Sequence, residues 1–199
     1  DAIEAMSASN DQPKGSLRVM VPHSFGNYFL SHIIACFVRT HPELSVDLDL
    51  RATFPDLLES GYDVAIHVGE PPVSNHRAKL IGQHQFVVCA SPDYLKKHGQ
   101  PHSPEDLVNH NCLIHKNLPE SSVWVFEQNK KQTRVKVKGN LSSNSSQSLK
   151  HAAIGGLGIV MLPDYTLKTE LSDGRLIQMF SAYCPKFIGL YALFPYTKH

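Results

Sequence analysis

Cysteine is scarce in this 199-residue sequence, and no two cysteines stand close together. None belongs to a CxxC motif, so the spacing indicates neither a zinc site nor a dense disulfide scaffold. We therefore expect reduced thiols and a cytoplasmic protein. The four cysteines are Cys36, Cys89, Cys112 and Cys184.

Long apolar runs and an excess of charge of one sign are also missing. Stretches such as Ile33 to Val38 are far shorter than a membrane span, and no charged-then-apolar leader opens the chain. The 19 Lys and Arg residues nearly balance the 18 Asp and Glu residues. We expect no membrane partner and no broad electrostatic footprint for nucleic acid.

The motifs of common enzyme classes are absent as well, since the sequence contains no GxSxG and no HExxH. The glycines between Gly155 and Gly158 follow a predicted helix and precede a predicted strand. A nucleotide-binding loop has the reverse order, because it leaves a strand and enters a helix. The sequence therefore predicts no enzyme, no cofactor and no metal site.

Hydrophobic periodicity in the first part of the chain predicts alternating strands and helices. The 42% apolar content is enough to build one large domain or two small ones. A βαβαβ series indicates a parallel sheet covered by helices, in an α/β fold. The predicted elements are strand Ser16–Val21, loop Pro22–Gly26, helix Tyr28–Thr40, strand Ser45–Leu50, a short helix near Asp56–Ser60 and strand Tyr62–Gly69.

The second part of the chain has a more mixed pattern of strands. Ser91-Pro92 and Ser103-Pro104 each place a capping hydroxyl before a proline, which predicts the start of a short helix. A further helix at Gln147–Ile154 should end at Gly155-Gly156. The predicted strands are Phe86–Ala90, Cys112–His115, a hairpin of Val123–Glu127 with Thr133–Lys138, Gly158–Leu162, Leu176–Phe180 and Phe187–Phe194.

Short motifs follow one another in a characteristic order from Gly15 to the end of the chain. They are GSLRV at 15–19, SFG at 24–26, HP at 41–42, GYDVAIHVG at 61–69, CASP at 89–92, HNCL at 110–113, Trp124, LP at 162–163, DGRL at 173–176 and YALFP at 191–195. In this order they resemble the effector-binding, or co-inducer-binding, domain of LysR-type transcriptional regulators.

The resemblance implies a fold similar to type II periplasmic solute-binding proteins. Two α/β subdomains would be joined by two crossover strands, with a ligand cleft between them. Residues 15–85 plus 184–199 would form subdomain I, residues 86–183 would form subdomain II, and residues 1–14 would be the end of a linker. Occupancy of the cleft would shift the subdomain angle and the oligomer shape, and so control transcription.

The resemblance also implies partners. The effector domains would pair as a homodimer through the Tyr28–Thr40 helix of one copy and the Gln147–Ile154 helix of another, with a tetramer in the full-length protein. DNA would be bound only through an N-terminal winged helix-turn-helix that this chain lacks. A small carboxylate or aromatic acid is the effector class that the family suggests.

In subdomain I, the loops after the first three strands carry the candidate effector-binding residues, because ligands of open α/β sheets bind at the carboxyl ends of strands. Ser24, beside Phe25, either holds an acceptor group of the ligand or caps a helix. Thr53 is either a ligand contact or an ordinary loop residue. His67 stands where the family commonly has an arginine, and it is either a titratable ligand contact or a hydrogen-bonded neutral histidine.

In subdomain II, His115 ends a predicted strand, while Asn144 to Ser146 precede a predicted helix, so both could contact a ligand. His115, Asn144 and Ser145 are the candidate effector-binding residues of this subdomain. A turn and a helix cap are the structural alternative for the serine and asparagine cluster.

Three further functions stay open. A periplasmic-type solute receptor shares the expected fold. Twelve histidines allow a regulator that responds to pH rather than to a small molecule. Cys112 and Cys184 raise a redox switch, although buried structural cysteine is the simpler interpretation.

Overall fold

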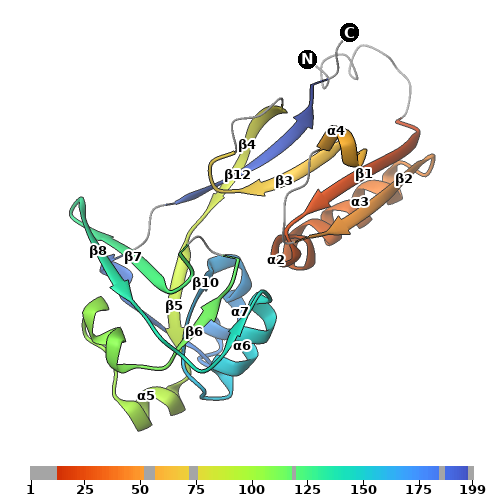
Figure 1. The fold of residues 1–199 in the computed structure, drawn as a ribbon. Helices are drawn as coiled ribbons and strands as arrows, with labels where there is room; N and C mark the ends of the chain where they lie inside the picture. The colour runs from red at the N-terminus through yellow and green to blue at the C-terminus, as the bar shows by residue number, and fades with distance from the viewer. Residues whose placement is uncertain (1–12, 52–56, 72–75, 118–119, 184–186, 197–199) are drawn as a thin grey trace. The chain divides into compact units, whose positions relative to one another are not determined.

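The computed structural model describes residues 13–51, 57–71, 76–117, 120–183 and 187–196. The chain forms two compact units, one of residues 1–80 with 191–199 and the other of residues 81–190 (Figure 1). Two strands, β4 (His76–His84) and β12 (Ile188–Pro195), run across the unit boundaries. The boundaries lie after Leu80 and Leu190, whereas the sequence placed them after residues 85 and 183.

The first unit is built on a sheet with the strand order β2-β1-β3-β12-β4. Strand β1 pairs in parallel with β2, from Gly15 opposite Leu44 to Val21 opposite Leu50, and in parallel with β3. The predicted βαβαβ series and parallel sheet are therefore confirmed. Strand β4 was not predicted, because its residues are mostly exposed and show no clear apolar alternation. The remaining bounds are β1 (Gly15–Val21), β2 (Leu44–Leu50), α4 (Leu57–Ser60) and β3 (Val64–Val68).

One continuous helical stretch follows β1, made of α2 (His23–Phe25), the π-helical turn η1 (Gly26–Leu30) and α3 (Ser31–Thr40). The predicted loop at Pro22–Gly26 is therefore wrong from His23 onward. Its polar residues hid the helix, which starts directly after Pro22. Gly26 lets the helix approach the sheet, since a Cβ there would lie 2.9 Å from side-chain carbons of Val21 and Leu50.

The second unit is built on a mixed sheet with the strand order β11-β5-β10-β6-β9. Strand β10 runs antiparallel to β5 and parallel to β6, and β6 runs parallel to β9. This confirms the mixed strand direction expected in the second half of the chain. The bounds are β5 (Phe86–Ala90), β6 (Cys112–His115), β9 (Ser142–Ser143), β10 (Ile159–Pro163) and β11 (Ile177–Met179).

Both faces of this sheet are covered, which explains the near-continuous apolar run of β5. Val87 and Cys89 pack into one cluster with Leu149 of helix α6 (Ser146–Ile154), while Phe86 and Val88 point into the cluster on the opposite face. Alternate side chains of a strand point to opposite faces, so a strand buried on both sides is apolar throughout. The second cluster includes Trp124, Phe126, Val135 and Val137.

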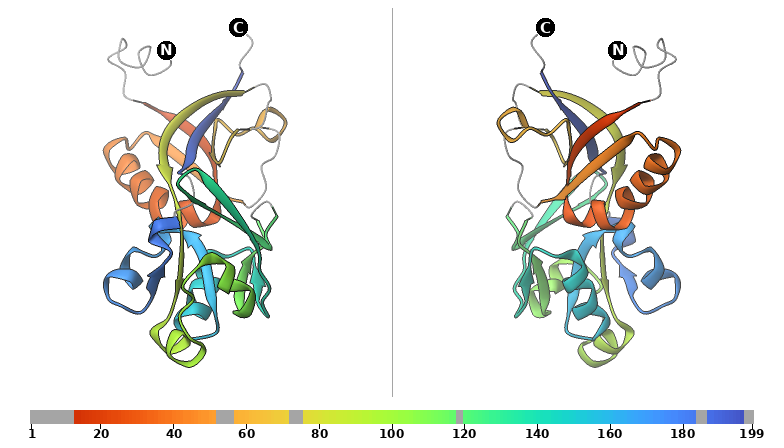
Figure 2. Two further views of the ribbon diagram at one scale, coloured as in Figure 1. Left: turned by 90° about the vertical axis from the view of Figure 1, so that its left-hand side faces the viewer. Right: turned by 90° about the vertical axis from the view of Figure 1, so that its right-hand side faces the viewer.

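A two-stranded hairpin, β7 (Val123–Gln128) and β8 (Lys131–Lys136), is shown in Figures 1 and 2. It supplies Trp124, Phe126 and Val135 to this cluster, and Val137 follows β8 directly. Its turn consists of Asn129 and Lys130, which have φ angles of 51° and 65°. Two left-handed residues form the tight turn that suits hairpin twist. The hairpin itself is confirmed, but its turn is shorter than the predicted Gln128–Gln132 connection.

Short helices complete the second unit. Ser91 caps α5 (Pro92–His98), and Ser103 with Asp106 forms a capping box at the 3₁₀ helix η2 (Pro104–Asn109), so both predicted helix starts are confirmed. Helix α6 closes at Gly155-Gly156, and Gly156 has a left-handed φ of 78°. The other elements are η3 (Asp164–Thr166), α7 (Lys168–Ser172) and η4 (Ser181–Tyr183).

Candidate functional site

In the second unit, polar residues gather where β6 and β9 end and α6 begins. The two strands pair in parallel, with Ile114 opposite Ser142 and His115 opposite Ser143. Their carboxyl ends therefore lie side by side. Helix α6 starts three residues after β9. This is the kind of strand end at which open α/β sheets bind ligands.

His115 is held by two hydrogen bonds. Its Nδ1 accepts from the backbone N–H of Asn117 at 3.4 Å, and its Nε2 lies 3.1 Å from the Ser146 hydroxyl oxygen. Because Nδ1 accepts, the proton of the neutral ring is on Nε2, which donates to Ser146. Burial lowers the pKa of His115, so the ring is neutral at pH 7.

Ser145 is the N-cap of α6, and its side chain accepts a hydrogen bond from the backbone N–H of Ser148 at 3.2 Å. Its own backbone N–H donates to the Ser143 hydroxyl at 3.1 Å. The cap interpretation of Ser145 is therefore the one that the geometry supports. Asn144 is exposed beside it. The first turn of α6 carries the partial positive charge of a helix N-terminus.

Of the predicted residues in this unit, His115 bonds to Ser146, and Ser145 bonds to Ser143 and Ser148, at the same junction of strand ends and helix start. The sequence placed Ser146 in the candidate run but did not predict its contact with His115; Ser146 is 4% exposed and orients the imidazole from inside the unit. The run from Ser142 to Ser146 was the available signal. It could not show which serine faces His115, because one residue along a helix rotates the side chain by about 100°.

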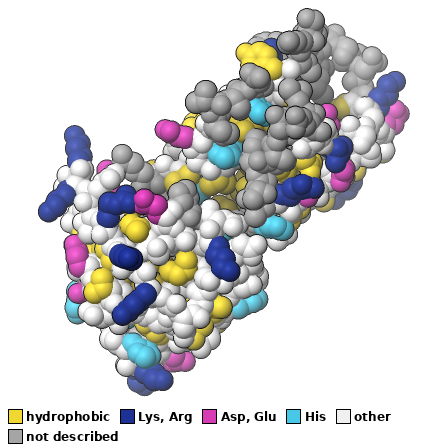
Figure 3. Space-filling view, in the orientation of Figure 1, with side chains coloured by type: hydrophobic (Ala, Val, Ile, Leu, Met, Phe, Trp, Pro, Cys, Tyr) yellow, Lys and Arg dark blue, Asp and Glu magenta, His cyan; other side chains and the backbone are white. Residues whose placement is uncertain are grey.

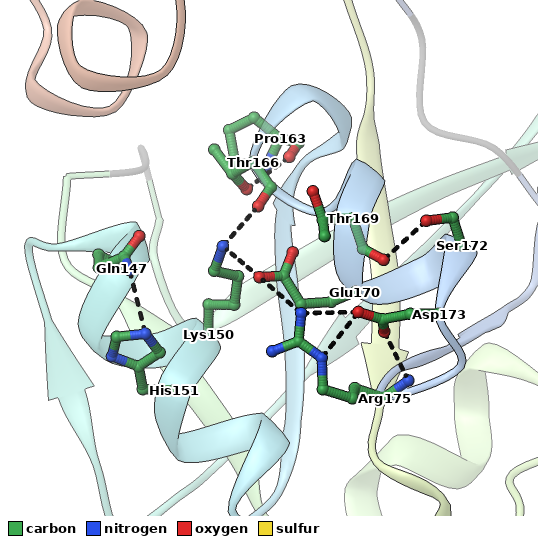
Figure 4. A network of polar contacts seen from close by, with 10 residues as sticks. All are labelled: Gln147, Lys150, His151, Pro163, Thr166, Thr169, Glu170, Ser172, Asp173 and Arg175. Atoms are coloured by element: carbon green, nitrogen blue, oxygen red, sulfur yellow. Dashed lines mark hydrogen bonds and ion pairs between the residues drawn. The ribbon is translucent and has the colours of Figure 1, made fainter.

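A buried ion pair anchors α6 to the segment that follows β10 (Figure 4). The Lys150 Nζ lies 2.7 Å from Oε1 of Glu170 and donates to the backbone carbonyl of Thr166 at 3.1 Å. Burial by itself raises the pKa of Glu170, but the hydrogen bond and charge of Lys150 bring it below its ordinary value. Arg175 adds a second cation 3.7 Å from the same carboxylate. The pair fixes α6 four residues after Ser146.

In the first unit, Ser24 and Phe25 lie in α2, directly after β1. Ser24 is half-buried, and Phe25 is buried with its ring stacked on Phe29 at 5.7 Å between centroids. His67 lies near the end of β3, with Nε2 3.2 Å from the Glu70 carbonyl oxygen. Burial is the main cause of a lowered pKa at His67, so this ring too is neutral at pH 7. The predicted contact Thr53 lies outside the described residues.

Ser24 and His67 stand at the same edge of one sheet. Strands β1 and β3 pair in parallel, with Val19 opposite Val64 and Met20 opposite Ala65, so both end on the same side. Each unit thus has polar side chains at the carboxyl ends of its parallel strands. Within the described residues, no group of three or more His, Cys, Asp or Glu side chains is placed to hold a metal ion.

The family model described as the LysR substrate binding domain matches residues 10–199. The chain belongs to this family. The resemblance seen in the motif order is therefore confirmed, and with it the two-part α/β fold. The regulatory domain of CrgA, a LysR-type transcriptional regulator from Neisseria meningitidis, superposes with a TM-score of 0.82 at 27% identity. That match covers 92% of this chain and 90% of that one.

Curated relatives of this LysR-family chain are transcriptional regulators. An uncharacterized HTH-type regulator of Haemophilus influenzae is 32% identical over 186 residues, which are 94% of this chain and 65% of that protein. The transcriptional activator TtdR of Escherichia coli K12 is 28% identical over 91% of this chain and 59% of its own length. The chain therefore spans less than two thirds of either regulator. No helix among its described residues is long and apolar enough to cross a membrane.

Proposed function

We propose that this chain is the ligand-sensing regulatory domain of a LysR-type transcriptional regulator, that it binds rather than transforms its ligand, and that it works in the cytoplasm. The observation that carries the proposal is the fixed imidazole of His115 beside the N-terminus of α6, in a chain that the LysR domain family matches over residues 10–199. Ligand recognition of this kind needs a few fixed polar groups at strand ends.

The effector that fits these groups best is a small carboxylate or aromatic acid. The start of α6 offers partial positive charge, and Asn144 and Asn117 add exposed amide groups beside it. Ser24 and His67 are the proposed contacts of the first unit. Both His67 and His115 are neutral at pH 7, so hydrogen-bond donors and helix N-termini, rather than an imidazolium, would receive the anion.

Regulation would follow from a population shift. An effector that binds one conformer of the domain more tightly than another shifts the equilibrium by no more than that difference in affinity. In the proposed full-length protein, an N-terminal winged helix-turn-helix binds DNA, and the change in conformer population alters how it binds. The helix-turn-helix naming of the longer relatives supports this arrangement.

A homodimer through α3 is part of the proposal. Leu30, Ile34 and Val38 are half-buried along one side of the continuous helical stretch of η1 and α3. A second stripe of apolar residues lies beside them and is exposed. Packing within a single domain buries only one face of a helix, so this second stripe can contact another chain. The proposed partner of this stripe is helix α6 of a second copy of this chain. The stripe consists of Phe29, Ile33 and Phe37, which are 40%, 51% and 39% exposed.

A redox switch has little support at two of the cysteines. Burial raises the pKa of the Cys89 and Cys112 thiols to about 12, so neither forms a reactive thiolate at neutral pH. Cys184, the other cysteine considered for a redox switch, lies outside the described residues.

Thermal unfolding in the presence of matched ligands tests the proposal. The probes are succinate and benzoate, with their uncharged amides as controls, followed by a wider panel of mono- and dicarboxylates. A ligand at a hundredfold its Kd stabilises the folded state by about 2.7 kcal/mol. We expect carboxylates, and not the amides, to raise the Tm, and His115→Gln to abolish the shift.

His151→Gln is the matched control, because His151 is an exposed histidine of helix α6 whose Nε2 lies 3.0 Å from Nε2 of Gln147. This variant should respond to carboxylates like the parent chain. A panel in which amides stabilise as well as carboxylates, or in which His115→Gln responds normally, would contradict the proposed site.

A further inference from the structure

The β7–β8 hairpin concentrates positive charge that the composition as a whole conceals. Residues 120–138 contain five Lys and Arg residues against two Glu residues, a surplus of three, whereas the whole chain has a net charge of +1. Figure 3 shows Lys and Arg side chains at the free end of the hairpin and along its outer side. The cations are Lys130, Lys131, Arg134, Lys136 and Lys138.

Alternation along β8 and the residues that follow it puts three of these cations in a row. Val135 and Val137 are 4% and 3% exposed, and they pack into the core of the second unit. Arg134, Lys136 and Lys138 therefore point to the opposite, exposed face. Same-face neighbours on a strand are about 6.6–6.8 Å apart, which makes an evenly spaced line of charge.

Most of this charge is not neutralised within the described part of the chain. Arg134 forms an ion pair with Glu120, and Gln132 donates to Glu127 at 3.5 Å. None of the four lysines forms an ion pair with a described residue. Lys130 and Lys131 lie at the turn, where the chain is exposed on both sides.

The chemistry of the hairpin favours one class of partner. Binding of single-stranded nucleic acid or of a protein hot spot relies on accessible aromatic side chains, but Trp124 and Phe126 are each 1% exposed. A row of cations along a strand, with further lysines at the turn and no exposed aromatic neighbours, suits a polyanion that is bound through charge alone. Duplex DNA presents such a backbone.

We propose that the outer face of the β7–β8 hairpin binds the phosphate backbone of double-stranded DNA, independently of base sequence. The choice of DNA rests on the proposed function, since a domain tethered to a DNA-binding segment meets DNA at high effective concentration. The hairpin would then add non-specific affinity to a site that other parts of the protein select.

Fluorescence anisotropy of a labelled random-sequence duplex with the 199-residue chain tests this inference. Each phosphate contact contributes about −0.9 to the slope of log K against log salt concentration. Replacement of Lys130, Lys131, Lys136 and Lys138 by glutamine should therefore flatten the slope by up to about 3.6 and weaken low-salt binding by at least about tenfold. The lysines are exposed, so thermal unfolding should be unchanged.

A matched control replaces four other exposed lysines, Lys14, Lys79, Lys96 and Lys97, by glutamine. Equal losses in the two variants would mean that net charge rather than the hairpin governs binding, and would overturn the inference. So would a parent chain with no salt-dependent binding, or competition by polyglutamate that equals duplex DNA at the same charge concentration. Stabilisation by carboxylates is measured separately, so the sensing function could still stand after any of these results.

Discussion

The imidazole of His115 and the hydroxyl of Ser146, 31 residues apart in the sequence, lie 3.1 Å apart at the junction of β6 and α6. The backbone N–H of Asn117 occupies the other ring nitrogen, so Nε2 carries the proton and needs an acceptor. The Asn117 N–H therefore determines the tautomer, and Ser146 orients the ring. The strand end and the helix start are coupled through this one bond.

Ser146→Ala should destabilise the chain and weaken binding of any carboxylate that stabilises the parent. Loss of the acceptor leaves a largely buried N–H without a partner, which costs about 1–3 kcal/mol of unfolding free energy. Urea denaturation at pH 7.5 measures the change. Ser148→Ala alters an exposed hydroxyl of the same helix and should stay within about 0.5 kcal/mol. Equal losses of unfolding free energy in both variants would show that the hydrogen bond to His115 does not contribute to stability.

Lys150→Met should destabilise the second unit more strongly. Glu170 would be left as a buried carboxylate with only Arg175 nearby, and breaking a buried pair in this way costs about 3–5 kcal/mol. The double variant Lys150→Met with Glu170→Leu removes both charges and should recover most of the loss. Lys97→Met is the exposed control in urea denaturation. A double variant no more stable than Lys150→Met would argue against an unpaired charge as the cause.

The order of elements could be predicted because hydrophobic periodicity reports burial. The run FVVCA at β5 is buried on both faces, and the parallel order of β1, β2 and β3 followed from the βαβαβ series. Strand β4 could not be predicted, because its place in the sheet depends on pairing with distant strands rather than on its own pattern. The helical residues 23–27 were not predicted for a related reason, since HSFGN has no local helical signal.

The region of the candidate site could be predicted from the sequence, but its side-chain contacts could not. The sequence placed His115 at a strand end and Ser145 at a helix start, but it did not show that the side chain in contact with the imidazole is that of Ser146. The balanced total charge likewise concealed the basic hairpin, because composition averages over surfaces that the fold separates. Side-chain partners depend on packing that pairs residues far apart in the chain.

Ile33→Lys should prevent the proposed dimer. Ile33 is the most exposed member of the stripe on α3, and a charge there makes burial against a second copy unfavourable. Sedimentation equilibrium should show a dimer for the parent chain and a monomer for the variant. Ala35→Lys, exposed on the other side of the helix, is the control and should remain dimeric. A parent chain that is monomeric at high concentration would remove the dimer from the proposal.

Stability should fall on acidification because of His84, at the end of β4. The ring is 2% exposed, lies edge-on to Phe86 and Tyr165, and neither nitrogen makes a hydrogen bond of good geometry with a described residue. Burial lowers the pKa of His84, and the Asp164 carboxylate and the nearby Gln85 backbone oppose that effect only in part. Between the folded and the unfolded pKa, the ring is therefore protonated in the unfolded chain and neutral in the folded chain.

Since the unfolded pKa is about 6.5, this contribution is constant above that pH and is lost as the pH falls from there toward the lower folded pKa. His84→Phe removes the titrating group from an aromatic setting, so its free energy of unfolding should decline less between pH 7.5 and 5. His102→Gln, an exposed histidine of the same unit, should follow the parent chain. His115 also has a lowered pKa, so part of the acid sensitivity should survive in His84→Phe. Parallel pH profiles for the parent and His84→Phe would mean that the buried ring does not contribute.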